Sequence, residues 1–371
     1  MVKKIVITGG HLTPAIAMIE KLKQQGWEII FVGRKYALEG EKIVSVEYQT
    51  ITKLGINFLP IVTGRLQRSL TRYTVFSLTK VPIGFFQSLY WLIKYKPKII
   101  LSFGSYVALP VALAGWILNI PIITHEQSVV PGMATKIISK LAKTICVSWV
   151  ETMSYFPKDK TVLTGNPLRR EIFRKIQISD SQYPISDDNL PLIYITGGSL
   201  GAQTINDVVI QILPKLLEKF RIIHQCGSKD YGKLLTNSNL LPATHKNRYI
   251  LTKYVEFLDI GWVLNNADLV ISRSGANTVS ELAALGKPAL LIPLPWSGQQ
   301  EQMKNAKILE QAGTAKILEQ KNLDSESLSQ CINSMIQDLQ KYQDNSHQAK
   351  ALISLNASEK ISDIINKTSI L

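Results

Sequence analysis

Cysteine is scarce in this sequence: the 371 residues contain three, at positions 146, 226 and 331. They lie far apart and lack the spacing of metal ligands, so we expect reduced thiols rather than a disulfide framework or a zinc site. No Asp-x-Asp motif occurs, and the pair Asp187-Asp188 lies in a polar, acidic stretch that suits a metal poorly. We therefore expect no metal ion and no other cofactor.

Acidic residues are missing from one long stretch. No Asp or Glu occurs between Tyr48 and His125, whereas eight Lys and Arg do. The whole chain has 42 Lys and Arg against 28 Asp and Glu, a net charge of +14, so this stretch supplies more than half of the excess. The excess predicts a negatively charged partner: a nucleic acid, an anionic membrane or a phosphorylated substrate.

A clean hydrophobic run long enough to span a membrane is also missing. The most apolar stretch, 107–123, is interrupted by Pro110, Gly115, Asn119 and Pro121 and falls short of ~20 apolar residues. We expect a buried helix and then a buried strand there. Glycines near the N-terminus break any signal-peptide core. With 46% hydrophobic residues, the chain is globular and its length suits two domains.

Short runs rich in Ile and Val alternate with amphipathic segments. The expected strands are 4–8, 28–33, 98–103, 121–124, 144–148, 161–164, 192–196, 221–225, 249–251, 269–272 and 289–293. The expected helices are 13–25, one within 67–95, 109–118, 131–141, 202–219, 276–285 and 300–311, the first capped by Thr13 with Pro14 behind it.

The alternation pauses in the polar stretch 178–189, which we interpret as an interdomain linker. Two successive βαβ series predict an α/β protein with two doubly wound, Rossmann-like domains facing across a cleft. We expect an N-terminal domain at 1–168, a C-terminal domain at 169–345, and a helical tail, 346–371, that packs back on the N-terminal domain. Ligands of such domains bind beyond the carboxyl ends of the strands.

Two glycine motifs follow expected strands and precede helices. Thr8-Gly9-Gly10-His11 brings backbone amides and a histidine to the carboxyl end of the first strand. The segment 197–202, Gly-Gly-Ser-Leu-Gly-Ala, suits a diphosphate and lacks the Lys-Ser/Thr of a P-loop. Either motif alone is also compatible with a tight turn.

Four further segments place polar groups at strand ends. The segment 272–281 offers amides and hydroxyls to a phosphate and Glu281 to a ribose diol, Gln299 to Gln302 suit sugar hydroxyls, and Arg169 suits a phosphate. The segment His125-Glu126-Gln127-Ser128 ends the acid-free stretch after a strand. Each segment also has a purely structural explanation: a capped surface helix for 272–281, a polar helix start for 299–302, an interdomain hinge with a surface arginine for Arg169, and residues that cap the next helix for 125–128.

Taken in order, these motifs resemble the MurG family of GT-B glycosyltransferases, which are peripheral-membrane N-acetylglucosaminyltransferases of peptidoglycan synthesis. The resemblance spans nearly the whole chain and includes Gly9-Gly10-His11, Lys96-Pro97, Gly104-Ser105-Tyr106-Val107, His125-Glu126-Gln127, Gly165-Asn166-Pro167-Leu168-Arg169 and the segments 197–202, 273–281 and 302–306. It implies inverting transfer of N-acetylglucosamine from UDP-N-acetylglucosamine to the 4-hydroxyl of an undecaprenyl-diphosphate-linked N-acetylmuramyl-peptide, at the cytoplasmic face of the plasma membrane.

Carried over by position, the resemblance also implies roles for single residues. The donor's diphosphate and ribose would contact Ser199, Ala276, Asn277, Thr278 and Glu281, with Val255 near the uracil, Arg169 at a phosphate and Gln302 at the sugar. His11 is the first candidate for the general base, with His125 and Glu126 as rivals, and Thr8, Gly9 and Gly10 would line the diphosphates. The family's Gly-Gly-x-Gly-Gly-His is shortened here to Thr8-Gly9-Gly10-His11, and its His-Glu-Gln-Asn ends in Ser128, a shorter sugar contact.

The acid-free stretch fits docking on anionic lipid because cations and large apolar residues alternate within it. We assign this contact to Arg65, Arg68, Arg72, Val75, Phe76, Lys80 and Phe85. Four residues that follow at helical spacing, Phe86, Leu89, Tyr90 and Ile93, are expected to be ordinary core.

Other functions share some of these features. A GT-B transferase that acts on another lipid acceptor, such as diacylglycerol, would have the same donor half. A nucleotide-sugar 2-epimerase would need carboxylates in both domains, which the acid-free stretch opposes. A nucleic-acid-binding protein fits the net charge, but no recognisable binding motif occurs. We therefore expect a UDP-sugar, a lipid-linked acceptor and a membrane surface as partners, and no nucleic acid.

Overall fold

The computed structural model describes residues 3–36, 44–64, 72–174, 183, 189–198 and 201–370, without the side chains of 72–79. The chain divides into two compact units. The first comprises Met1–Arg169 and Ser354–Leu371, and the second comprises Arg170–Ile353. The expected boundary, 168/169, lies one residue from this division.

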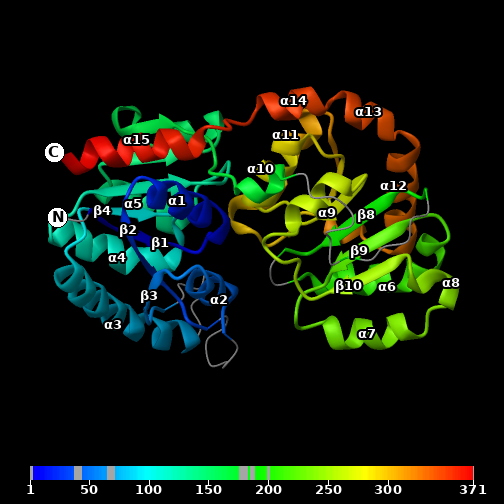
Figure 1. The fold of residues 1–371 in the computed structure, drawn as a ribbon, viewed down its shortest axis with the longest axis horizontal. Helices are drawn as coiled ribbons and strands as arrows, with labels where there is room; N and C mark the ends of the chain where they lie inside the picture. The colour runs from blue at the N-terminus through cyan, green and yellow to red at the C-terminus, as the bar shows by residue number, and fades with distance from the viewer. Residues whose placement is uncertain are drawn as a thin grey trace. The chain divides into compact units, whose positions relative to one another are not determined.

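The first unit is built on a seven-stranded parallel sheet in the order β3-β2-β1-β4-β5-β6-β7 (Figure 1). Its strands are β1 (Lys4–Thr8), β2 (Glu28–Gly33), β3 (Asn57–Pro60), β4 (Ile99–Ser102), β5 (Ile122–Glu126), β6 (Thr144–Val147) and β7 (Thr161–Leu163). Its helices are α1 (Leu12–Gln24), α2 (Val46–Lys53), α3 (Arg72–Tyr95), α4 (Ser105–Ile117), α5 (Met133–Leu141) and α15 (Ala357–Ile370).

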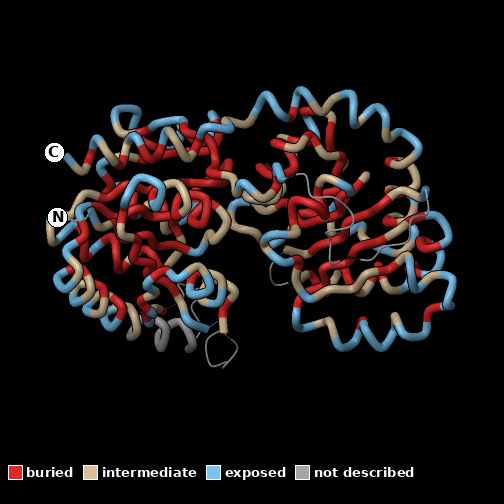
Figure 2. Tube along the Cα trace, viewed as in Figure 1, coloured by how far each residue is buried: buried red, intermediate tan, exposed pale blue. Residues whose placement is uncertain are grey.

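The core of the first unit lies on both faces of this sheet (Figure 2). Val6, Ile100 and Ile122 pack with buried side chains of α3, α4 and α5. The alternate residues Ile5 and Ile7 are equally buried, because α1 and α15 pack on each other and on the sheet. Burial on both faces explains why these strands read as continuous apolar runs.

The second unit repeats this plan with six parallel strands in the order β10-β9-β8-β11-β12-β13. The strands are β8 (Leu192–Thr196), β9 (Arg221–Gln225), β10 (Tyr249–Thr252), β11 (Leu269–Ser272), β12 (Ala289–Leu291) and β13 (Ala315–Ile317). The helices are α6 (Gln203–Leu217), α7 (Tyr231–Asn239), α8 (Ala243–Lys246), α9 (Ile260–Asn266), α10 (Ala276–Leu285), α11 (Glu301–Gln311), α12 (Ser325–Gln337), α13 (Leu339–Asp344) and α14 (Ser346–Ala351). The two sheets confirm the expected pair of doubly wound domains.

Each sheet changes direction at its centre. In the first unit the chain moves outward from β1 to β2 and β3 and then returns to β4 on the other side of β1. In the second unit the same reversal lies between β8 and β11. Ligands of doubly wound sheets bind outside the carboxyl ends of the strands at such a switch point. The glycine motifs after β1 and β8 therefore lie where the topology places a ligand.

Several local expectations are corrected. The first helix begins at Leu12 with His11 at its N-cap, so Thr13 is not the cap. The short strands β3 and β13 were not expected, because each is an edge strand of only a few residues. Of the expected linker, Tyr183 and Asn189 are described, and the Tyr183 ring stacks on Trp262 at 6.1 Å.

The expected tail 346–371 is divided between the units. Helix α14 packs on α10 in the second unit, whereas α15 packs on α1 in the first, although it ends the chain (Figure 1). An ion pair joins Lys21 of α1 to Glu359 of α15 at 2.9 Å. Among the described residues, no helix combines the length and the apolar character that crossing a bilayer requires.

Candidate functional site

Backbone fills the space at the carboxyl end of β1. Gly9 has φ +136°, and a Cβ there would lie 2.9 Å from the backbone of Phe103, at the end of the neighbouring strand β4. A Cβ on Gly10 would lie 2.8 Å from the Ser105 hydroxyl. Both positions exclude larger residues, so the chain can pass close beneath a ligand here. Thr8, by contrast, is fully buried and lies below this surface.

His11 follows these glycines as the N-cap of α1, with no hydrogen bond from its side chain to the helix. It is half-buried. Its charge helps to lower the pKa of His125, so the two rings lie within electrostatic reach of each other. The structure therefore brings His11 near His125, which lies within β5 rather than after the strand as predicted.

His125 is occupied on both ring nitrogens. Its Nε2 lies 2.9 Å from the Gly165 carbonyl, and its Nδ1 lies 3.1 Å from Nε2 of Gln127. Because the carbonyl can only accept and the amide nitrogen can only donate, Nε2 carries the proton. Burial is the main cause that lowers the pKa of His125, to about 4. A neutral, fully buried ring with both nitrogens bonded is a structural group rather than a proton acceptor.

Glu126 is also committed to its surroundings. It is buried, and its Oε1 accepts a hydrogen bond from the Ser128 amide at 3.1 Å, while Oε2 accepts one from the Gly132 amide at 3.2 Å. The carboxylate thus holds the turn between β5 and α5. Ser128 is buried in this turn, where its carbonyl accepts from the Thr152 hydroxyl at 3.0 Å. The structure therefore does not place Ser128 on an open surface of the unit.

In the second unit, Gly197 and Gly201 of the glycine motif after β8 are closely surrounded by backbone. A Cβ on Gly201, whose φ is +77°, would lie 2.1 Å from the Cys226 carbonyl at the end of β9. A Cβ on Gly197 would lie 2.1 Å from the Ala202 amide nitrogen. Ser199 lies outside the described residues.

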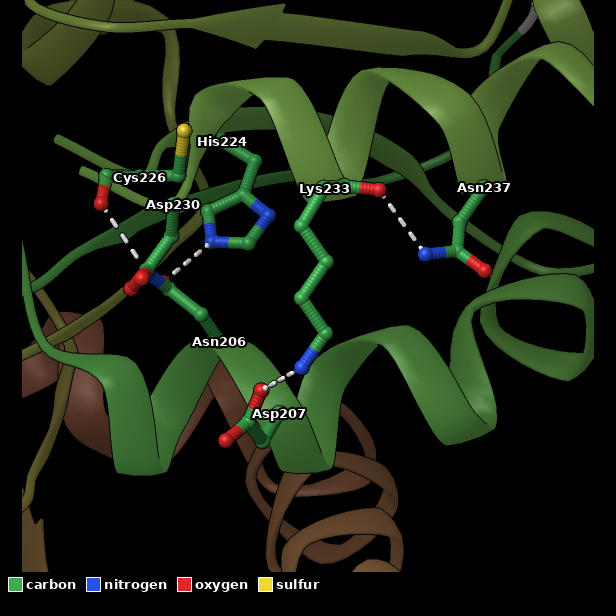
Figure 3. Close-up of polar contacts among 7 residues, drawn as sticks. All are labelled: Asn206, Asp207, His224, Cys226, Asp230, Lys233 and Asn237. Carbon is green, nitrogen blue, oxygen red and sulfur yellow. Dashed lines mark hydrogen bonds and ion pairs between the residues drawn. The ribbon is translucent and has the colours of Figure 1, made fainter. Parts of the chain in front are cut away.

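A polar network around Asn206 reaches the Cys226 carbonyl, which Gly201 also approaches (Figure 3). Asn206 of α6 donates to the Cys226 carbonyl at 2.9 Å and to the Asp230 carboxylate at 2.8 Å, and its Oδ1 lies 3.0 Å from Nε2 of His224. Nδ1 of His224 lies 3.0 Å from the Tyr249 hydroxyl. Burial lowers the pKa of His224 to about 3, so the ring is neutral. The network ties α6, β9, β10 and the start of α7 together.

Helix α10 starts at the switch point of the second sheet. Gly275 is its N-cap, and no side chain caps its first amides. Asn277 and Thr278 are half-buried in the first turn, and Glu281 lies one turn further along, so the three side chains share a helix face. The backbone amides of a first helical turn and the helix dipole favour an anion at such an end. Ala276 is buried at the first helical position.

The remaining candidate positions have different environments. Gln302 lies in the first turn of α11. Its side-chain oxygen accepts from the Leu294 amide at 2.9 Å, and its carbonyl accepts from the Ser274 hydroxyl at 2.7 Å. Val255 is buried, and its amide donates to Gln225 at 2.9 Å. Arg169 is half-buried at the end of the first unit's main segment.

The surface of α3 overturns one expectation. Phe86, Tyr90 and Ile93 were assigned to the core, yet they are 65%, 56% and 53% exposed. Leu89 packs against the core as predicted, and Phe85, which was assigned to the lipid contact, packs there as well. Ile83 on α3 and Leu113, Trp116 and Ile117 on the adjoining α4 are exposed as well.

We call the exposed residues Ile83, Phe86, Tyr90, Ile93, Leu113, Trp116 and Ile117 the α3–α4 apolar surface. Exposed Lys94, Lys96 and Lys98 flank it in sequence. Among the residues expected to contact lipid, Lys80 is half-buried on α3, Arg65 and Arg68 lie outside the described residues, and Arg72, Val75 and Phe76 lie on α3 with side chains that are not described.

No three His, Cys, Asp or Glu side chains in the described part of the chain lie close enough together to hold a metal ion. Three supporting residues were missed by the sequence analysis: Asn206, His224 and Gln225. A histidine and a glutamine at the end of an apolar strand are the available signal, because a polar side chain buried there must find partners. Their partners lie 18 to 31 residues away in sequence, which a local pattern does not reveal.

Comparison with known families gives matches in both units. The glycosyltransferase family 28 N-terminal domain matches residues 6–147, and the glycosyltransferase family 28 C-terminal domain matches residues 192–366.

Curated relatives align over nearly the whole chain. One from Lachnoclostridium phytofermentans is 37% identical over 349 residues, 92% of this chain and 92% of the relative. One from Clostridium botulinum is 34% identical over 370 residues, 98% of this chain and 99% of the relative. Both are named UDP-N-acetylglucosamine–N-acetylmuramyl-(pentapeptide) pyrophosphoryl-undecaprenol N-acetylglucosamine transferase.

The crystal structure of MurG from Acinetobacter baumannii superposes with a TM-score of 0.69 at 27% identity and covers 98% of this chain and 99% of that one.

Proposed function

Because this chain belongs to the MurG family of glycosyltransferases, we propose that it transfers N-acetylglucosamine from UDP-N-acetylglucosamine to the 4-hydroxyl of an undecaprenyl-diphosphate-linked N-acetylmuramyl-peptide, with inversion. The family resemblance inferred from the motifs is thereby confirmed, as is the prediction that the chain is a hexosyltransferase. The observation that carries the proposal is the 37% identity, over 92% of this chain, to a relative named for this activity, together with glycine motifs at both topological switch points.

The second unit is proposed to bind the donor. The start of α10 and the glycine motif after β8 suit the diphosphate, because backbone N–H groups and the dipole at a helix start stabilise anions. Ser199, Ala276, Asn277 and Thr278 belong to this diphosphate and ribose contact. The carboxylate of Glu281 would accept hydrogen bonds from the ribose hydroxyls.

Three positions complete the proposed donor site. Val255 would flank the uracil through its chain neighbours rather than its buried side chain. Gln302 would offer its amide nitrogen to the sugar, because its oxygen already accepts from Leu294. Arg169 would pair with a phosphate.

His11 is proposed as the general base of the first unit, and Thr8, Gly9 and Gly10 as the turn beneath the reacting groups. The acceptor hydroxyl must lose a proton as it attacks the anomeric carbon. An imidazole with a pKa near neutral accepts that proton without a large perturbation. Both ring nitrogens of the rival His125 and both carboxylate oxygens of the rival Glu126 are hydrogen-bonded to the surrounding chain, which supports His11.

The α3–α4 apolar surface is proposed to dock on the cytoplasmic face of an anionic membrane. Exposed apolar side chains with lysines beside them suit the interface between lipid headgroups and acyl chains. The lipid carrier of the acceptor lies in such a membrane, so docking would bring the enzyme to its substrate. Of the residues that the sequence assigned to this contact, Phe85 packs against the core, and Arg65, Arg68, Arg72, Val75, Phe76 and Lys80 stay part of the proposal. The proposal includes no nucleic acid among the partners.

The experiment that tests the proposed function compares acceptors. Purified protein is incubated with UDP-N-acetylglucosamine and either the undecaprenyl-diphosphate-linked muramyl-peptide or diacylglycerol, and both UDP and product are measured. We expect turnover with the first acceptor, unchanged by EDTA, since no metal or other cofactor is proposed. Turnover only with diacylglycerol would assign the chain to another lipid acceptor, and restoration by magnesium after EDTA would refute metal independence.

A further inference from the structure

The side chain of Gln225 contacts two segments of the proposed donor site, at Gly198 and at Val255, although no ligand contact is assigned to it. It is the last residue of β9, it is buried, and it lies between β8 and β10 in the sheet. Its position is opposite Thr196 on one side and Thr252 on the other. Both neighbouring strands continue into loops proposed to contact the donor.

All four hydrogen bonds that the amide of Gln225 can make are present. Nε2 donates to the Thr196 hydroxyl and to the Gly198 carbonyl, each at 3.0 Å. Oε1 accepts from the Tyr194 hydroxyl at 3.1 Å and from the Val255 amide at 2.9 Å. The Gly198 carbonyl can only accept and the Val255 amide can only donate, so the orientation of this amide is determined by its partners.

The bond to Gly198 determines where a carbonyl dipole points. Gly198 has φ +86°, and its amide donates to the same Thr196 hydroxyl at 3.0 Å. Its carbonyl also accepts from the Gly201 amide at 3.1 Å. Two donors therefore hold this oxygen against the protein. An oxygen released from them could turn toward a bound diphosphate and repel it.

We propose that Gln225 is a positioning residue that holds Gly198, on the diphosphate side of the site, and Val255, on the uracil side, in one arrangement. Through Nε2 it keeps the Gly198 carbonyl away from the anion, and through Oε1 it fixes the Val255 backbone. The inference rests on the proposed function, because it presumes that UDP binds beside these two segments. Its consequence is that the two halves of the amide act on different parts of the ligand.

The variant Gln225→Glu tests the role of Nε2 separately from that of Oε1. The introduced carboxylate still accepts from Val255 and Tyr194, but in its ionised form it cannot donate to Gly198. At pH 8.5 we expect the Kd for UDP to rise about tenfold, the scale of a lost buried hydrogen bond, while the Kd for uridine changes less than about twofold. At pH 5.5 the protonated carboxyl regains a donor, so the ratio of the two Kd values should return toward that of the wild type at the same pH.

The matched control is Tyr194→Phe, which removes one donor to Oε1 and leaves both bonds of Nε2. We expect its UDP-to-uridine ratio to equal that of the wild type. If Gln225→Glu does not fold, Thr196→Val serves instead, because it removes the hydroxyl that Gln225 and Gly198 share, and the same selective loss of UDP affinity is expected.

Calorimetry with UDP and with uridine gives the decisive comparison. A folded Gln225→Glu protein with the wild-type ratio at pH 8.5 would overturn the inference and leave the proposed function intact. Equal weakening of UDP and uridine at both pH values would also overturn it, since that pattern indicates general disruption. Failure of the wild type to bind UDP at all would overturn the proposed function and this inference together.

Discussion

His11 follows β1 and Glu126 ends β5, two strands separated only by β4, but their side chains have different environments. The Glu126 carboxylate holds two backbone amides of a buried turn. His11 stands at a helix start without capping that helix through its side chain. A catalytic base must exchange a proton with substrate, so a side chain whose oxygens already hold the fold together is the poorer candidate.

We therefore expect His11→Ala to lower kcat by ~10²–10⁴-fold, the usual scale of general-base catalysis, with little change in UDP affinity. Steady-state kinetics and UDP titration measure the two quantities. Glu126→Gln is the control. We expect it to lower the melting temperature, because the buried turn is disturbed, and to change kcat little in the protein that remains folded. Near-normal turnover of His11→Ala, together with a collapse of kcat in a folded Glu126→Gln protein, would transfer the role to Glu126.

Glu281 offers a second test of a single side chain. If its carboxylate accepts from the ribose hydroxyls, Glu281→Ala should weaken UDP binding by ~1.5–3 kcal/mol, which is the range for hydrogen bonds to a charged group. Calorimetry with UDP and 2′-deoxy-UDP identifies the contact. Wild-type protein should discriminate between the two ligands, and the variant should not. Equal discrimination by both proteins would place the ribose elsewhere.

Helix α3 packs into the core with one face and exposes large apolar side chains on the other. Its inward face, with Phe85, Leu89 and Leu92, joins the core of the first unit. Its outward face carries Phe86, Tyr90 and Ile93 in contact with solvent. Exposing several large side chains on one face has no benefit for folding, and patches of this kind mark interaction surfaces. The adjoining α4 extends the same surface with Trp116 and Ile117.

We expect Phe86→Ser to reduce binding to anionic vesicles by about tenfold, because burial of a large aromatic side chain is worth roughly 1.5–3 kcal/mol. Sedimentation with vesicles of phosphatidylglycerol and phosphatidylcholine measures the effect. Leu240→Ser is the matched control, since Leu240 is 80% exposed in the other unit. Equal vesicle binding by Phe86→Ser and the wild type would show that this surface serves another partner.

Each of the two units contains one histidine that burial keeps neutral, and both affect the stability of the molecule in acid. The pKa is about 4 for His125 and about 3 for His224, against 6.5 for an exposed ring. Below pH 6.5 these two histidines therefore bind protons in the unfolded chain but stay neutral in the folded chain until the pH approaches 4. Stability is complete above this pH and falls as the pH drops toward the folded values.

At pH 4.5 each histidine is expected to lower the free energy of unfolding by roughly 2 to 3 kcal/mol relative to pH 7, because pH 4.5 lies two units below the pKa of the unfolded chain. Urea unfolding at both pH values measures the loss. His224→Gln should lower stability at pH 7, because a network is disturbed, yet it should show a loss at pH 4.5 that is smaller by about this amount. An acid-induced loss equal to that of the wild type would show that His224 titrates normally in the folded protein.

The sequence by itself determined the architecture and the location of the proposed donor site. Parallel strands buried on both faces produce continuous apolar runs, and glycines that must pass close to other backbone cannot be replaced, so both signals are local. The strands β1, β2, β8, β9 and β11 agree with the predicted ranges residue for residue. The glycine motifs lie at the two switch points as the βαβ order predicts.

Only the tertiary structure decided which face of α3 meets solvent and which polar residues are already engaged. A helix with large apolar residues on more than one face has no unique inward side until its neighbours are in place, which is why Phe86 and Phe85 exchanged roles. Likewise, the sequence ranked His125 and Glu126 beside His11. Their partners Gly165 and Gly132 become neighbours only when the chain folds, and these contacts set the three residues apart.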